Sequence, residues 1–214
     1  MNHNSVELLG FYGGDKTHSL SAWTSTERDY DSKKSRMPNL LGRLAADNHH
    51  TPFEKSSLHF LVDTDIATHI HLLKHRIGVS INAESARYKE LKEDKYYVPA
   101  DWYEDIKTNK WYHRLQTWTE ESNKMYHDCL EDLTPVLGRK RAKESARFFK
   151  TYNSQIVSDM QFNFRSFMHF QGLRNSEHAQ LEVRELAQQM LKLVQDIPGN
   201  PFEYSLKAFG YDIK

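Results

Sequence analysis

Residues 74–88 carry an unusual density of side chains that could bind a charged ligand. The cationic and donor side chains of Lys74–Arg76 are followed by a glycine-containing turn, and then by Ser85 and Arg87. Guanidinium groups and serine hydroxyls match the oxygens of a phosphate, so the pattern indicates a site for a phosphate-bearing ligand. A solvated turn between two apolar runs is the alternative interpretation.

A second polar group lies in the C-terminal half of the chain. Arg165 and His169 are four residues apart, so a helix would align them on one side. His178 and Gln180 stand at the opening of an amphipathic segment, where the exposed N–H groups of a helix attract anions. We expect an anion-binding site here, and a polar loop with a helix cap is the alternative.

Other chemistries have little support in the sequence. Among the 12 histidines, His71 and His75 could share a helix face, but Lys74 between them would repel a metal cation. No Gly-x-Ser-x-Gly elbow occurs, and phosphate-binding glycine loops are absent. We therefore predict no metal site, and we expect any nucleotide to be held by side chains.

The elements that position these residues alternate between strands and helices. In the first half of the chain, the patterns predict strands over 7–12 and 57–62, helices over 35–47 and from Asp65 onward, and an extended segment over 80–88. The helix from Asp65 would carry an apolar stripe of Ile66, Ile70, Leu73 and Ile77. The basic segment would then lie at a junction between a helix and a strand.

The second half of the chain is mainly helical. A long helix should follow the turn at 98–101, with an apolar face formed by Trp111, Leu115, Trp118, Met125 and Cys129. After a break at 135–138 we expect a second helix, a strand or irregular crossing over 151–157, and a helix over 166–173. The clearest helix carries the stripe Ala179, Val183, Leu186, Met190, Leu193 and Ile197. The pattern predicts an α+β fold, with a small sheet packed against long helices.

Composition limits the class of protein. A chain of 214 residues is typical of a single domain, and we expect residues 1–214 to form one. Lys plus Arg equals Asp plus Glu at 29 each, so no net field would attract nucleic acid or a membrane, and the basic run 138–143 is typical of a solvated helix start. No apolar segment is long enough to span a membrane, and the single cysteine, Cys129, fits a reducing compartment. We expect a cytoplasmic protein in which Cys129 packs as a small apolar residue.

Taken together, these motifs resemble the flavin-dependent thymidylate synthases. The family signature of Arg-His-Arg, Ser-x-Asn and Ser-x-Arg-Tyr is similar to Lys74–Arg76, Ser80–Asn82 and Ser85–Tyr88. Upstream, 49–54 resembles the family's His-x-Thr-Pro-Phe-Glu element. Downstream motifs follow in the family's order, at Arg147, Asn163-x-Arg165 and 173–180.

The resemblance implies a specific reaction on a small, mainly antiparallel α+β domain. Such enzymes methylate dUMP to dTMP, with 5,10-methylenetetrahydrofolate as the carbon donor, NADPH as the reductant and FAD as the bound cofactor. Hydride comes from the reduced flavin, so the protein needs no cysteine nucleophile, which agrees with the independent interpretation of Cys129. The family also implies a homotetramer with shared active sites. A noncatalytic flavin- or nucleotide-binding homologue is the alternative function, and an interaction module is a third.

The resemblance also implies a role for each matched position. The residues expected to bind FAD are His49, Thr51, Glu54, Lys74, His75, Arg76, Asn163, Arg165, His169 and His178. The residues expected to bind dUMP are His71, Lys74, Glu84, Ser85, Ala86, Arg87, Arg147 and Arg174. Arg174 would be catalytic, because a fixed cation beside the uracil ring stabilises the negative charge that develops there.

Several positions depart from the family pattern. Lys74 replaces the first arginine of the signature, and one extra residue separates Arg76 from Ser80. Ala83 stands where an acid is usual, so the role of the neighbouring Glu84 is open. His169 and His71 stand where asparagine and glutamine are usual. The first 48 residues match loosely, and Thr24 and Ser25 are their candidates for cofactor contacts.

Overall fold

The computed structural model describes residues 3–211, which form two compact units. The sheet unit comprises residues 5–62, 73–81 and the chain from Asp159 onward, whereas the helical unit comprises residues 63–72 and 82–158 with the segment that ends at Asn4. Strands and helices are interleaved along the chain as the sequence pattern indicated, and the strands form one small antiparallel sheet, so the predicted α+β class is confirmed. The expectation of a single domain over 1–214 stays a prediction.

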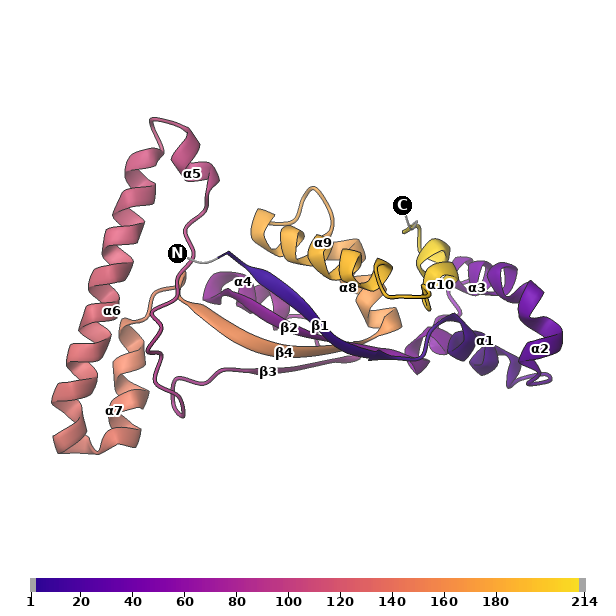
Figure 1. The fold of residues 1–214 in the computed structure, drawn as a ribbon, viewed down its shortest axis with the longest axis horizontal. Coiled ribbons are helices and arrows are strands. Elements are labelled where there is room, and N and C mark those ends of the chain that lie inside the picture. The colour runs from indigo at the N-terminus through magenta and orange to yellow at the C-terminus, as the bar shows by residue number, and fades with distance from the viewer. Residues whose placement is uncertain (1–2, 212–214) are drawn as a thin grey trace. The chain divides into compact units, whose positions relative to one another are not determined.

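Four antiparallel strands form one sheet in the order β1-β2-β4-β3 (Figure 1). They are β1 (Ser5–Tyr12), β2 (Ser57–Asp65), β3 (Val79–Ala83) and β4 (Gln155–Asn163). The direction of the β3–β4 pair follows from two backbone hydrogen bonds, from Asn163 to Gly78 and from Glu84 to Val157. Residues 58, 60 and 62 of β2 are buried and alternate with half-buried neighbours, which is typical of a strand with one face on a core.

Two helices cover the core of the sheet unit. The helix α8 (Phe164–Arg174) packs against α9 (Leu181–Gln195), and α9 lies along β1 (Figure 1). The predicted stripe on α9 is confirmed at Val183, Leu186 and Met190, which are fully buried. The core beneath α8 is aromatic, with rings of Phe60, Phe162, Phe167 and Phe170 within 6.2 Å of one another in successive pairs.

Shorter helices complete the sheet unit. They are α1 (Asp15–Trp23), α2 (Tyr30–Lys33), α3 (Met37–Ala46), α10 (Glu203–Ala208) and the 3-10 helices η1 (Lys34–Arg36) and η2 (Thr51–Lys55). The helix predicted over 35–47 is therefore confirmed, whereas α1 and α10 have no apolar periodicity that would have predicted them. Both α1 and α8 pack against η2, so the shorter helices position a segment that carries predicted site residues.

A chain of buried hydrogen bonds joins α1, α10 and Ser56, the residue that follows η2. The imidazole of His18 is fully buried, with Nδ1 2.8 Å from the Ser205 hydroxyl and Nε2 2.6 Å from the Ser56 hydroxyl. Ser205 donates its hydroxyl proton to Asp15 at 2.5 Å. The Ser205 oxygen must then accept from His18 Nδ1–H, which leaves Nε2 to accept from Ser56. Only the neutral imidazole satisfies this chain, and burial lowers the pKa of His18 to about 3.

The helical unit is built on an antiparallel pair of helices, α6 (Asn109–Leu137) and α7 (Arg139–Ala146) (Figure 1). They meet at Gly138, whose φ of 77° lies in the left-handed region that glycine adopts without strain. A buried cluster of Tyr126, Leu130, Ala142 and Ala146 joins them, and Cys129 packs against this cluster as expected. The shorter α4 (Ile66–Leu72), α5 (Asp101–Glu104) and η3 (Arg147–Phe149) belong to the same unit.

The predicted apolar face of the long helix is wrong. Trp111, Trp118 and Met125 are 51%, 56% and 38% exposed, whereas the buried positions include Thr119 and Ser122. The buried polar side chains have partners, because the Thr119 hydroxyl contacts the Asn153 side chain and Ser122 donates to the carbonyl of Phe149. Hydrogen bonding therefore decides which side of α6 faces the unit, and an aromatic stripe remains outside.

Two further predictions need correction. The helix from Asp65 ends at Leu72, and its supposed apolar stripe is largely outside, since Leu73 and Ile77 are 47% and 78% exposed. Thr68, His69 and Leu72 are buried instead. The extended segment predicted over 80–88 ends at Ala83, and residues 85–88 form a turn. The strand or irregular crossing predicted over 151–157 is the strand β4, which begins at Gln155 and extends to Asn163.

Within residues 3–211, no helix is long and apolar enough to cross a membrane. Over the same residues, no three His, Cys, Asp or Glu side chains are grouped so that they could hold a metal ion.

We predict that His18 makes the stability of the protein depend on pH. The unfolded chain binds a proton at His18 below pH 6.5, whereas the folded chain does so only near pH 3. Stability from this residue is present above pH 6.5 and falls as the pH decreases, by ~1.4 kcal/mol per pH unit. Urea unfolding of wild type and His18→Gln between pH 6.5 and 5 should show a flatter dependence in the variant. Equal slopes would contradict a neutral buried His18.

Candidate functional site

The predicted site residues fall into two groups, one in each unit. The sheet unit holds His49, Thr51, Glu54, Lys74, His75, Arg76, Asn163, Arg165, His169, Arg174 and His178. The helical unit holds His71, Glu84, Ser85, Ala86, Arg87 and Arg147. The division follows the predicted ligands closely, because most of the residues expected to bind FAD are in the first group and most of those expected to bind dUMP are in the second.

In the sheet unit, Arg174 and His75 are in direct contact. Arg174 Nε donates to His75 Nε2 at 2.9 Å, and both side chains are half-buried. Arg174 lies in the last turn of α8, while His75 follows the end of α4 in the chain. Burial, together with the charges of Arg174 and His169, lowers the pKa of His75 to about 4. His75 is therefore a neutral acceptor at physiological pH.

The turn after Arg76 is bonded to the start of α8. Asn163 caps this helix by accepting from the backbone N–H of Ser166 at 2.8 Å, and its own backbone N–H donates to Gly78 at 2.9 Å. Ser166 donates its hydroxyl to the carbonyl of Ile77 at 2.7 Å. Gly78 has a φ of +64°, and a Cβ there would lie 2.3 Å from Asn163 Nδ2. The turn between Arg76 and Ser80 is therefore held closely against the start of α8.

The remaining cationic or donor side chains predicted for the site in the sheet unit lie on α8, beside His75 or in the turn before α9. Arg165 is half-buried and His169, one helical turn later, is exposed. Lys74 and Arg76 are exposed on either side of His75. His178 is exposed in the turn before α9, where its backbone N–H donates to the Ser176 hydroxyl at 3.3 Å. Residues on and beside α8 therefore offer several positive or donor groups to an anionic ligand.

The η2 segment presents His49, Thr51 and Glu54 to solvent. Phe53 anchors the segment, because its ring is fully buried 5.2 Å from His18 and 6.3 Å from Phe164 at the start of α8. Among residues 3–211, these three polar side chains form no ion pair or side-chain hydrogen bond with His75 or Arg174. The structure thus packs η2 against α8 without joining their predicted ligand-binding side chains.

In the helical unit, the turn at 85–88 is attached to α7. Arg87 Nε donates to the Ser85 hydroxyl at 3.4 Å, and Lys143 Nζ donates to the carbonyl of Tyr88 at 2.7 Å. Arg147 follows Lys143 by four residues, so both side chains lie on the same side of the helical segment. We refer to Ser85, Arg87, Lys143 and Arg147 as the basic group, because hydroxyl, ammonium and guanidinium groups are the donor types that bind phosphate.

Sequence reasoning missed Lys143, since the run at 138–143 resembled a solvated helix start. The sequence did contain a signal for it, because Lys143 precedes Arg147, a residue predicted to bind phosphate, by one helical turn.

A buried lysine supports the position of Arg147. Lys150 donates to Asp94 at 2.7 Å and to the Asn123 side chain at 2.8 Å, and its side chain is only 5% exposed. Its ammonium lies 4.3 Å from the centre of the Tyr126 ring. Burial lowers the pKa of Lys150, and the carboxylate of Asp94 opposes that shift. These contacts hold the η3 turn against α6.

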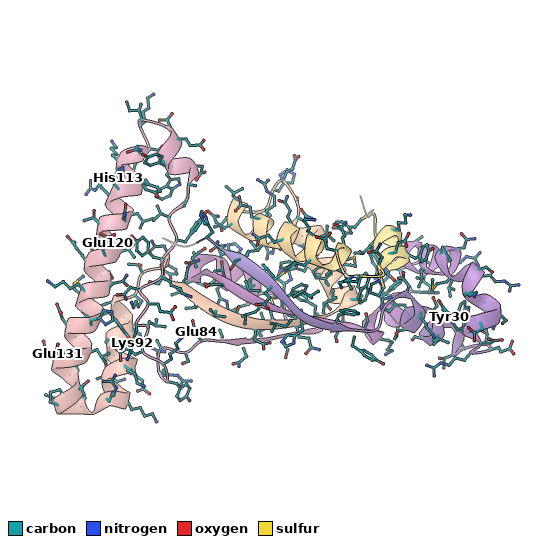
Figure 2. The ribbon with its side chains drawn as sticks, viewed as in Figure 1. Tyr30, Glu84, Lys92, His113, Glu120 and Glu131 are labelled. Carbon is teal, nitrogen blue, oxygen red and sulfur yellow. The ribbon has the colours of Figure 1, made fainter. Side chains whose placement is uncertain are left out.

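Glu84, labelled in Figure 2, is occupied by contacts within its own unit. Its carboxylate accepts from Lys89 Nζ at 2.6 Å and from the backbone N–H of Val157 at 3.0 Å. The backbone N–H of Glu84 also donates to the carbonyl of Val157, and together these contacts hold the end of β3 against β4. Glu84 therefore has a clear structural role, and its predicted contact with a nucleotide stays a prediction.

The other candidates lie apart from these contacts. His71 is half-buried in the last turn of α4, and Ala86 is half-buried in the turn that follows β3. The hydroxyls of Thr24 and Ser25 donate hydrogen bonds to the α1 carbonyls of Leu20 and Ala22, each at 3.0 Å. These two hydroxyls extend the end of α1, and a cofactor contact for them stays a prediction.

Comparison with known proteins identifies relatives along most of the chain. The family described as "Thymidylate synthase complementing protein" (Thy1) matches residues 7–198. A flavin-dependent thymidylate synthase from Thermosipho melanesiensis is 33% identical over 180 residues, which are 81% of this chain and 77% of the relative. One from Streptomyces avermitilis is 28% identical over 204 residues, 89% of this chain and 82% of the relative.

A solved structure shares the fold. The crystal structure of a UMP/dUMP methylase from Streptomyces cacaoi bound with 5-Br dUMP matches with a TM-score of 0.83 at 26% identity. The match covers 99% of this chain and 96% of that chain. The same methylase bound with 5-Br UMP matches with a TM-score of 0.76 at 25% identity.

We predict that Gly78→Ala destabilises the protein, because the new methyl group would collide with Asn163 and Ser166 at a positive φ. The cost should be about 1–3 kcal/mol in chemical unfolding. Gly172→Ala is the matched control, since no atom lies within 4 Å of its Cβ position in α8. That control should be stabilised by about 0.5–1 kcal/mol. Equal effects of the two substitutions would contradict the described turn.

Proposed function

Because the chain belongs to the thymidylate synthase complementing protein family, we propose that it is an FAD-dependent thymidylate synthase. Membership of this family confirms the predicted resemblance and the prediction of a methyltransferase. In the proposed reaction, 5,10-methylenetetrahydrofolate supplies the carbon that converts dUMP to dTMP, and NADPH supplies the reducing equivalents. The products are dTMP, tetrahydrofolate and NADP⁺.

The basic group on the helical unit is the observation that carries the proposal. A nucleoside monophosphate presents a dianion, and Ser85, Arg87 and Arg147 offer a hydroxyl and two planar forks to its oxygens. Lys143 holds the turn that carries Ser85 and Arg87 against α7, so the group is supported before a ligand binds. We assign the dUMP phosphate to this group, with Ala86 as a backbone neighbour.

The donor set of the sheet unit fits FAD. The pyrophosphate of FAD requires cations and N–H donors, and Arg76, Arg165 and His178 supply them from accessible positions. Asn163 is held at the helix start by its contact with Ser166, and Gly78 permits the close approach of the turn after Arg76 to these two side chains. When bound, FAD would supply the hydride chemistry, while the protein binds and orients the reactants. His49, Thr51, Glu54, Lys74 and His169 complete the proposed cofactor residues.

Arg174 is the proposed catalytic residue. Its guanidinium is permanently charged and held in place by His75, so it can stabilise negative charge on a uracil carbonyl without rearranging. Lys74, His71 and Glu84 are the further proposed dUMP residues.

The environment of Cys129 supports a reaction without a cysteine nucleophile. Cys129 is half-buried in the interior of α6 and packs against an apolar cluster. A reactive thiolate needs a neighbouring cation, a helix N-terminus or a metal to lower its pKa. In the described part of the chain, Cys129 takes part in packing alone.

We propose a homotetramer located in the cytoplasm, with residues 1–214 acting as one domain. The exposed aromatic stripe of α6 supports the assembly, because Trp111 and Trp118 leave large apolar surfaces in contact with water. Burial of two indole rings against a second copy would stabilise the assembly by several kcal/mol, at about 25 cal/mol per Å² of apolar surface.

We predict that the FAD-loaded protein converts dUMP to dTMP with one NADPH consumed per product. The assay should include UMP, since the solved relative is described as a UMP/dUMP methylase. Arg174→Ala should retain FAD and lose at least about 100-fold in kcat/KM, because it removes a charge aimed at the developing anion. Arg141→Ala, an exposed arginine of α7, is the control and should keep wild-type activity. A flavin-loaded wild-type protein that forms no dTMP would support the noncatalytic alternative instead.

We also predict that Trp118→Glu lowers the oligomeric state, measured by light scattering after gel filtration. A charge placed at the centre of an apolar interface would be desolvated without a partner. Glu131→Lys is the matched control, because Glu131 (labelled in Figure 2) is exposed on α6 and about 140° around the helix from Trp118. Retention of the wild-type mass by both variants would remove the α6 stripe from the interface.

A further inference from the structure

The contact between His75 and Arg174 has a defined donor and acceptor. Arg174 Nε carries a hydrogen at every accessible pH, so it donates, and His75 Nε2 accepts at 2.9 Å. The single proton of the neutral imidazole must then be on Nδ1. One side of the His75 ring is thus committed to Arg174, and the other carries the only N–H of the ring.

Packing fixes the plane of the His75 ring. Its centre lies 4.9 Å from that of Phe170, and the two rings meet edge to face at 73°. Phe170 is fully buried and precedes Arg174 by one helical turn in α8. The same helix therefore supplies both the surface that holds the imidazole and the guanidinium that it contacts.

The hydrogen bond restricts Arg174 in a specific way. A guanidinium has five N–H groups in one plane, and the bond to His75 uses the one on Nε. Rotation of the plane about the side chain would break this bond. The two terminal amino groups are consequently held as a fork, free to face an oxygen-bearing ligand.

We propose that His75 is a positioning residue for Arg174, acting by accepting from its Nε and aiming its terminal amino groups at a pyrimidine carbonyl. This role rests on the proposed function and is additional to any contact of His75 with FAD. It also explains why a lysine at position 174 would be a poor substitute, since an ammonium has no Nε–H to anchor and no fork to aim.

The charges around His75 support a permanent acceptor role. Arg174 and His169, both on α8, oppose a second positive charge on the His75 ring. With burial, they keep the imidazole neutral above about pH 4. His75 is therefore poorly suited to act as a general base near neutral pH.

The test compares His75→Gln, which keeps an acceptor at a similar distance from the backbone, with His75→Leu, which has none. In holoenzyme loaded with FAD, His75→Leu should weaken dUMP binding and kcat/KM together by about tenfold, as expected for one lost hydrogen bond to a charged group. His75→Gln should recover to within about threefold of wild type. His59→Gln on β2, whose partner is Asp159, is the control and should change neither value. Equal losses in the Gln and Leu variants would overturn the proposal.

A second measurement does not depend on turnover. In the ¹⁵N-labelled full chain, the Nε–H signal of Arg174, assigned by its absence in Arg174→Lys, should shift in His75→Leu and stay near its wild-type position in His75→Gln. It should also shift in wild type as the pH falls through the pKa of His75. An Arg174 signal that ignores both changes would overturn the positioning role even if dTMP is formed. The expected shifts without dTMP formation would retain the positioning of Arg174 while rejecting the proposed reaction.

Discussion

The geometry of the sheet-unit site depends on Asn163, which ends β4 and caps α8. Its side chain accepts from Ser166, its backbone donates to Gly78, and the Ser166 hydroxyl returns a bond to Ile77. These bonds join the turn after Arg76 to the start of α8. Because a helix is stiff, fixing its first turn also fixes the direction of Arg165, His169 and Arg174 along it. The site is therefore positioned by backbone and capping groups, and its cations are left free for ligands.

The acidic side chains near the predicted site residues are largely paired within the protein, whereas several cations remain exposed. The chain has a net charge of zero, yet its predicted ligand-binding positions are rich in cations. Most acidic side chains near them are already committed, such as Glu84 to Lys89 and Val157, and Asp94 to Lys150 and His127. Arg87, Arg147 and Arg76 remain exposed, so an anionic substrate or cofactor can provide the compensation. A balanced composition thus coexists with local concentrations of accessible cations.

On α6, polar side chains are buried while large apolar side chains are exposed. Its buried side includes hydrogen-bonded Thr119, Ser122 and Asn123, while its indole rings are outside. This inversion is confined to part of the helix, because Tyr126 and Leu130 of α6 pack against α7 through apolar surface. Around Thr119–Asn123, α6 contacts its own unit through polar side chains, although burial normally selects the apolar face of a helix.

The sequence by itself determined the α+β class, the strands at 7–12 and 57–62, the helix α9 and the family. Periodicity predicts such elements when one face is uniformly apolar, and the order of several short motifs identifies a family without coordinates. It failed for α4 and α6. On α6, burial follows hydrogen-bond partners far away in the chain, such as Asn153 for Thr119. It also could not reveal His18, whose neighbours Ser56 and Ser205 are 38 and 187 residues away.

For the site, the sequence determined which residue types could bind phosphate and redox ligands, because local motifs carry that information. Only the tertiary structure decided that Glu84 clamps β3 to β4, that Lys143 supports the turn before Lys89, and that His75 contacts Arg174 across 99 residues. The physical reason is that the type of each side chain is given by the local sequence, whereas its position depends on which backbone segments pack together in the fold. The hydrogen bond of 2.9 Å between Arg174 and His75 depends on that packing, and no local pattern in the sequence predicts it.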